Sequence, residues 1–165
     1  MESGLEIHLC HEHDHQERLL DDLLAIIETW SGLKNNEVEN NPKSLDDARE
    51  ALNLLKEDTY EHFEREEHGL FSNLRTDYPE LGTELDAMTK AHDVICRQLE
   101  ALDEILNSAT DNSPLTVRAD AAAAIKRLEV LQKKHTQHEW GVISRLLERL
   151  DDARRSVILQ QLREL

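Results

Sequence analysis

Two segments of the chain repeat one arrangement of residues that can bind a metal ion. His62 precedes Glu66 by four positions, and His135 precedes Glu139 by four positions. In a helix, residues four apart lie one turn apart on the same face, so each segment would present an imidazole and a carboxylate in one direction. Imidazole and carboxylate groups bind iron, zinc and manganese. One such pair says little, but its repetition predicts a metal site shared by two helices.

A second pair of segments is also repeated. His13 is followed by Asp, Arg and two Leu residues at the same intervals as His92. The chain therefore looks like a duplicated helical hairpin, in which each half supplies one single histidine and one His-x-x-x-Glu segment. Such a duplication suits a two-fold pseudosymmetric site for two metal ions. The predicted metal ligands are His13, His62, Glu66, His92, His135 and Glu139.

The first repeat begins with four closely spaced histidines, which cannot all face the interior. His13 continues the apolar stripe of residues 16–30 at spacings of three and four. His15 lies about 200° around the helix from His13, and His8 and His11 lie near the start of the helix. We therefore predict that His13 is the ligand, that the other three lie at the surface, and that His15 is the alternative ligand.

The elements that must position these residues are helices. Apolar residues at helical spacing predict helices at about residues 4–30, 44–76, 80–107 and 114–150, with a short helix at 152–164. Short connections between long helices force antiparallel neighbours. We therefore expect an all-α fold, an up-down-up-down four-helix bundle with a short fifth C-terminal helix, in a single domain that covers residues 1–165.

Helix-ending and helix-starting residues separate these segments. The first helix should end before Ser31-Gly32 and the polar stretch from Lys34 to Lys43, and Ser44 with Asp47 resembles a capping box. Tyr78-Pro79 should stop the second helix, and Pro114 should lie in the first turn of the fourth. On these bounds His13 lies roughly 26 Å from the end of its helix and His62 roughly 27 Å from the start of its own, so the two meet at one level.

The charge of the chain limits its partners. It has 35 acidic and 19 basic residues, for a formal net charge of −16. A nucleic acid or an anionic membrane would be repelled, so neither is an expected partner. The first ten residues lack the basic start and apolar stretch of a secretory signal, which predicts a cytoplasmic protein. Cys10 and Cys96 are too few for a disulfide scaffold and are expected to be reduced thiols.

Together, the single histidine near the start, HFEREEHGLF, AHDVICRQLEAL and HTQHE resemble the hemerythrin-like family, also called the HHE cation-binding domain. The resemblance covers nearly the whole chain. It implies a non-haem centre of two iron ions, bridged by an oxo or hydroxo group and two carboxylates. In this sequence it makes His13, His62, His92 and His135 terminal ligands and Glu66 and Glu139 the bridging carboxylates.

The sequence departs from the oxygen-carrying hemerythrins at one place. These carriers have a second histidine one turn along the third helix, where this chain has Cys96. The departure argues against simple oxygen carriage and for a protein that binds dioxygen, nitric oxide or peroxide, in defence against oxidative or nitrosative stress. Whether the protein also turns these molecules over stays open. Glu67, His138 and Cys96 are candidates for extra ligands or for neighbours of the ligands.

Other functions compete with this interpretation. Some relatives sense iron or oxygen or repair iron–sulfur clusters, although we expect no additional domain of the kind they carry. A ferritin-like oxidase would need Glu-x-x-His on two helices, and Glu12 to His15 is the only such spacing in the chain. A metal-free helical interaction module, whose histidines respond to pH, is the alternative of another class. The oligomeric state stays open.

Overall fold

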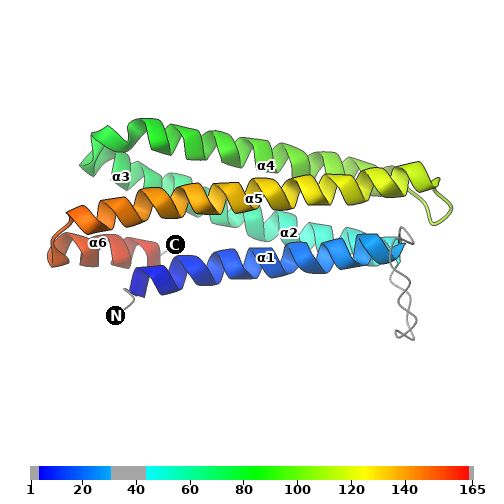
Figure 1. Cartoon of the computed structure of the whole chain (residues 1–165), viewed down its shortest axis with the longest axis horizontal. Coiled ribbons are helices and arrows are strands. Elements are labelled where there is room, and N and C mark those ends of the chain that lie inside the picture. The colour runs from blue at the N-terminus through cyan, green and yellow to red at the C-terminus, as the bar shows by residue number, and fades with distance from the viewer. Residues whose placement is uncertain (1–3, 31–43, 164–165) are drawn as a thin grey trace.

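The computed structural model describes residues 4–30 and 44–163, with side chains for residues 13–30, 44–158 and 160. Four long helical segments lie side by side in up-down-up-down order, as predicted (Figure 1). Helix α1 (Gly4–Trp30) packs against α2 (Leu45–Arg65) and α5 (Leu115–Arg149), and α4 (Gly82–Ser108) packs against the same two helices. None of the helices within the described ranges is long and apolar enough to cross a membrane.

The ends of the helices follow from local chemistry. The capping box at Ser44 is confirmed, because the Ser44 hydroxyl accepts a hydrogen bond from the Asp47 amide and the Asp47 carboxylate accepts one from the Ser44 amide. Pro114 lies just before α5, which begins at Leu115. Helix α6 (Asp152–Arg163) follows a break at Leu150 and packs against α1. The segments Ser31-Gly32 and Lys34 to Lys43 lie outside the described residues.

The second helical segment is not the continuous α-helix expected at residues 44–76. After α2 it continues as a π-helix, η1 (Glu66–Phe71), and then as α3 (Ser72–Asp77). A π-helix forms i→i+5 hydrogen bonds and so holds an extra residue per turn; such segments are rare and often lie at functional sites. The segment ends at Tyr78, and a 3₁₀ turn, η2 (Pro79–Leu81), leads into α4.

Two apolar clusters fill the bundle, one on each side of a polar section. The first cluster lies toward the C-terminal end of α1 and includes Leu23, Leu55 and Leu102. The second lies toward the C-terminal end of α5 and includes Leu70 and Ile143. Between them the buried side chains are polar or charged, and five of them are predicted metal ligands, while the sixth ligand, His13, is partly buried. The apolar clusters therefore fix the helices while the section between them carries the chemistry.

Candidate metal centre

The six predicted ligands meet in the polar section of the bundle. They come from α1, α2, η1, α4 and α5, and five of them are 5% exposed or less, namely His62, Glu66, His92, His135 and Glu139. The side chain of His13 is 11% exposed. Each His-x-x-x-Glu segment does place its two side chains on one face, since His62 Nε2 lies 2.9 Å from Glu66 Oε1 and His135 Nε2 lies 3.9 Å from Glu139 Oε2. The four helices thus bring imidazoles and carboxylates to one place in the interior.

The four histidines form two pairs. The ring centroids of His13 and His62 are 5.3 Å apart, and those of His92 and His135 are 4.5 Å apart. Glu66 lies against one member of each pair, because its oxygens are 2.9 Å from His62 Nε2 and 3.2 Å from His92 Nε2. A carboxylate in this position can contact two ions at once.

Glu139 has the same relation to the other two rings. Its Oε2 lies 3.1 Å from His13 Nε2 and 3.9 Å from His135 Nε2. Each glutamate therefore reaches one histidine of each pair. This arrangement matches a site in which two cations share two carboxylates, with one histidine pair at each cation.

The distances between the ligand atoms are also close to those expected around a bound metal ion. Metal–nitrogen bonds of about 2.1 Å place two ligand atoms on one ion roughly 3.0 to 3.4 Å apart. Nε2 of His92 and Nε2 of His135 lie 3.2 Å apart. Ligand atoms of His13, His62 and Glu66 lie within 4.8 Å of one another, as do those of Glu66, His92 and His135. Only modest side-chain movement would be needed to bring each group onto one ion.

The two carboxylates have imidazoles within ion-pair distance but lack well-directed hydrogen bonds. No oxygen of Glu66 or Glu139 accepts a hydrogen bond of acceptable geometry from the described residues, although imidazole nitrogens lie close by. A buried, unpaired carboxylate costs several kcal/mol or changes its protonation state. Cations bound between the carboxylates would remove this cost. The chemistry of the residues therefore fits a pair of metal ions.

Protonation of the metal-free cluster is uneven. Burial disfavours ionisation of Glu66, but the positive charge of His62 and the close contacts with His62, His92 and Glu139 together outweigh it and hold the pKa of Glu66 well below its usual value. Burial and the neighbouring Glu66 charge raise the pKa of Glu139 to about 7. Burial lowers the pKa of His135 to about 3, helped by the charges of His92 and His13. The cluster thus tolerates one ionised carboxylate more easily than two.

Glu67 was one of the three candidates for an extra ligand or neighbour, and it contacts a ligand. Its Oε1 lies 2.7 Å from Nδ1 of His92, on the ring atom that does not face Glu66. Burial disfavours the charged ring, but Glu66 and Glu67 together raise the pKa of His92. Phe63 stacks on the same imidazole with centroids 3.8 Å apart. The His92 ring is therefore held at its edge by Glu67 and on its face by Phe63.

The other candidates are not members of the ligand groups found among the described residues. His15 is 56% exposed and faces Asp58, with 3.6 Å between Nε2 and Oδ1, and His138 is exposed. Cys96 packs against the first apolar cluster, where burial raises the pKa of its thiol. A protonated thiol is a poor metal ligand. The side chains of His8, Cys10 and His11 lie outside the described residues.

Sequence reasoning did not single out a second buried polar layer beside the ligands. Gln16, Thr59 and Gln132 lie three residues from His13, His62 and His135, and all three side chains are buried. Their signal in the sequence was a polar residue at a position where the apolar stripe should continue. The π-helix left no comparable signal, since its residues suit an ordinary helix apart from Gly69.

Comparison with known protein families identifies the family of the chain. The family model described as hemerythrin HHE cation binding domain matches residues 8–147, which is most of the chain. Neither the search of curated proteins nor the search of solved structures gave a match. The matched region contains all six residues of the polar cluster.

Proposed function

The chain belongs to the hemerythrin HHE cation-binding family, and from this premise we propose that its cluster of six residues holds two non-haem iron ions. His13, His62, His92 and His135 would be terminal ligands, and Glu66 and Glu139 would each bind both ions. The small molecules proposed to bind there are dioxygen, nitric oxide and peroxide, with a role in defence against oxidative or nitrosative stress.

One observation carries the proposal more than any other. Two glutamates are buried without hydrogen bonds to their carboxylate oxygens, and each lies against one histidine of each pair. An interaction module that never bound metal would gain nothing from this arrangement and would bear its folding cost. The family match supports cations in general, while the choice of iron rests on what the family resemblance implies.

Each group of residues has a different role in this proposal. The histidines and glutamates would bind and orient the ions, and the apolar clusters on both sides would limit the access of water to them. Glu67 fixes the orientation of the His92 ring by accepting a hydrogen bond from its Nδ1–H. An iron pair with four imidazoles and two carboxylates has open coordination positions, through which it would bind small molecules and exchange electrons with them.

Anaerobic loading tests the proposal. Metal-free protein is given ferrous iron, freed of excess, and analysed for iron, and its absorption is then followed on addition of oxygen, nitric oxide or peroxide. The expected result is about two iron ions per chain and near-ultraviolet absorption typical of an oxygen-bridged ferric pair after oxidation. The matched double variant Glu66→Gln with Glu139→Gln should lose most of the iron. Wild-type protein without bound iron after loading would contradict the proposal.

A further inference from the structure

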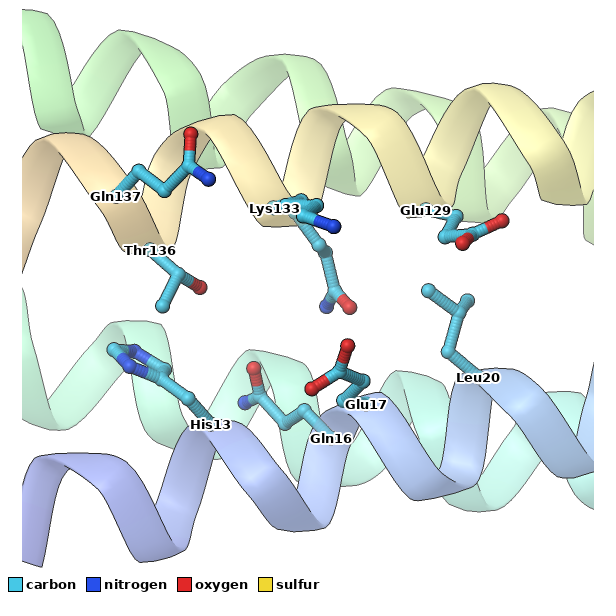
Figure 2. A pocket seen from close by; sticks show the side chains of 9 residues that line it. His13, Gln16, Glu17, Leu20, Glu129, Lys133, Thr136 and Gln137 are labelled. Carbon is cyan, nitrogen blue, oxygen red and sulfur yellow. The ribbon is translucent and has the colours of Figure 1, made fainter.

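A pocket borders the candidate metal centre between α1 and α5. Its volume is about 240 Å³, and His13 forms part of its wall. Figure 2 shows side chains from the two helices facing each other across this space, with His13 at one end and Leu20 at the other. Since water occupies roughly 30 Å³ in the liquid, the pocket can hold several small molecules. His13 is also the most exposed of the six ligands, so this side gives access to the centre.

Two buried amides line the pocket next to the ligands. Gln16 lies three residues after His13, and Gln132 lies three residues before His135. Since α1 and α5 run in opposite directions (Figure 1), three residues after His13 and three residues before His135 lie toward the same end of the bundle. Gln16 is 5% exposed and Gln132 is 7% exposed. The pocket is thus polar where it approaches the centre.

The side-chain nitrogens of these amides have no hydrogen-bond partner among the described residues. A buried donor without a partner costs about 1–3 kcal/mol, and one turn further on the same helices carry Leu20 and Leu128, which would fit an apolar wall. The hydroxyl of Thr59, in the same layer, is likewise buried without a partner. This layer therefore suits an occupant that forms hydrogen bonds.

The charges around the pocket favour a neutral occupant. Its wall contains the carboxylates of Glu17 and Glu129 and a single ammonium group, that of Lys133. The chain as a whole has a formal net charge of −16, so an anion would be repelled both at a distance and at the mouth. An apolar diatomic molecule would enter but would leave the amides of Gln16 and Gln132 unpaired. A small neutral molecule that donates and accepts hydrogen bonds is not repelled by the carboxylates and can pair with both amides.

We infer that this pocket is a binding site for hydrogen peroxide, in which Gln16 and Gln132 hydrogen-bond the molecule beside the His13 side of the metal centre. The inference rests on the proposed function, and it selects peroxide among the three small molecules named there. The two glutamines act as specificity-determining residues, because their amides stabilise a hydrogen-bonding molecule and not an apolar one.

The first test compares two reactants in the iron-loaded protein. The variant Gln16→Leu with Gln132→Leu replaces both amides by apolar side chains of similar size. Stopped-flow absorption should show the rate constant for hydrogen peroxide falling about tenfold, as expected for the loss of hydrogen bonds to the bound molecule, while the rate constant for nitric oxide stays the same or rises. Gln98→Leu on α4, which does not line this pocket, is the matched control and should leave both rate constants unchanged.

The iron content of each variant is measured first, so that loss of metal is separated from loss of selectivity. With iron retained, equal changes in the two rate constants, or no change in either, would overturn the inference and leave the proposed function intact. A wild-type protein that took up no iron would overturn the proposed function instead.

The second test does not depend on metal. Metal-free, ¹⁵N-labelled protein is titrated with hydrogen peroxide, and the side-chain amide signals are followed by NMR. The signals of Gln16 and Gln132 should shift with a common dependence on concentration, and that of Gln98 should not. Unchanged signals of Gln16 and Gln132 would overturn the inference even if iron binds.

Discussion

Glu67 Oε1 lies 2.7 Å from His92 Nδ1, while the other nitrogen of the same ring faces Glu66 at 3.2 Å. Two consecutive glutamates thus reach opposite nitrogens of one imidazole. Both belong to the π-helical segment η1, whose extra residue per turn changes the directions of its side chains relative to an α-helix. The π-helix therefore has a local role, which is to supply both a predicted ligand and the residue that orients another.

Removal of the Glu67 carboxylate should weaken metal binding. Groups that orient a ligand histidine typically contribute 10- to 100-fold to metal affinity. We expect Glu67→Ala to lower ferrous iron affinity by about this factor, and Glu67→Gln to lower it less, because the amide oxygen still accepts the Nδ1–H hydrogen bond. Competition with a chelator under anaerobic conditions measures both. Glu61→Ala is the control, because Glu61 is exposed and lies on α2 close to this segment. If Glu67→Ala bound iron as tightly as this control, Glu67 would not orient His92.

Metal affinity should fall as the pH is lowered. Glu66 and Glu67 raise the pKa of His92 above 6.5, so near pH 6 a metal ion must displace a proton from this ring, and protonated imidazole cannot bind metal. In Glu67→Ala the pKa of His92 falls, and the decrease in affinity should move to lower pH. Titrations between about pH 7.5 and 5.5 measure this. An affinity that stayed flat over this range would count against ligation by histidine.

Glu139→Gln should stabilise the metal-free protein. At pH 8 the buried carboxylate is ionised, and the rise of its pKa from 4.5 to about 7 corresponds to about 3 kcal/mol of lost stability. The amide has nearly the same shape and no charge, so its urea-unfolding free energy in a chelator should be higher by an amount of this order. Leu146→Ala in the second apolar cluster, which removes only packing, should do the opposite.

The stability that the metal-free protein gains from Glu139→Gln should increase with pH. A carboxyl whose pKa is higher in the folded state stabilises the fold fully below pH 4.5, and this stability is lost as the pH rises through about 7. The lowered pKa of His135 acts in the opposite sense, since its contribution is present above 6.5 and is lost as the pH falls toward 3. His135 is present in both proteins, so its contribution cancels in the difference between their unfolding free energies. This difference should be larger at pH 8 than at pH 5. A difference that does not change with pH would contradict the raised pKa of Glu139.

Removal of metal should lower the melting temperature of the wild-type protein. A ligand present at about 1,000 times its dissociation constant stabilises the folded state by about 4 kcal/mol. Thermal unfolding with and without a chelator should therefore differ clearly for wild type and much less for Glu139→Gln. A metal-free interaction module would be indifferent to the chelator in both forms.

The fold followed from the sequence because its determinants are local. The apolar stripes, the Ser44 capping box and Tyr78-Pro79 each act within a few residues, and the helices begin and end close to the predicted positions. The π-helix after Arg65 could not be predicted, since residues 66–71 suit an ordinary α-helix apart from Gly69. Its glutamates contact His92 on α4, a residue that is distant in the sequence.

The convergence of the six residues was also predictable, since the duplicated pattern places them at matching heights in the bundle. The pairing of the histidines and the distances to each glutamate required the structure. The contact of Glu67 with His92 joins α4 to the π-helix and has no signature in spacing. The polar layer of Gln16 and Gln132 became meaningful only when both side chains proved to be buried and their nitrogens had no hydrogen-bond partner among the described residues.

X-ray absorption at the iron edge tests the central claim most directly, namely that Glu66 and Glu139 are shared by two ions. In iron-loaded protein we expect nitrogen and oxygen ligands only, with a second iron at roughly 3 to 4 Å. Glu66→Gln with Glu139→Gln should lose the iron–iron signal. An isolated iron in the wild-type protein, or a sulfur ligand from Cys96, would contradict the account.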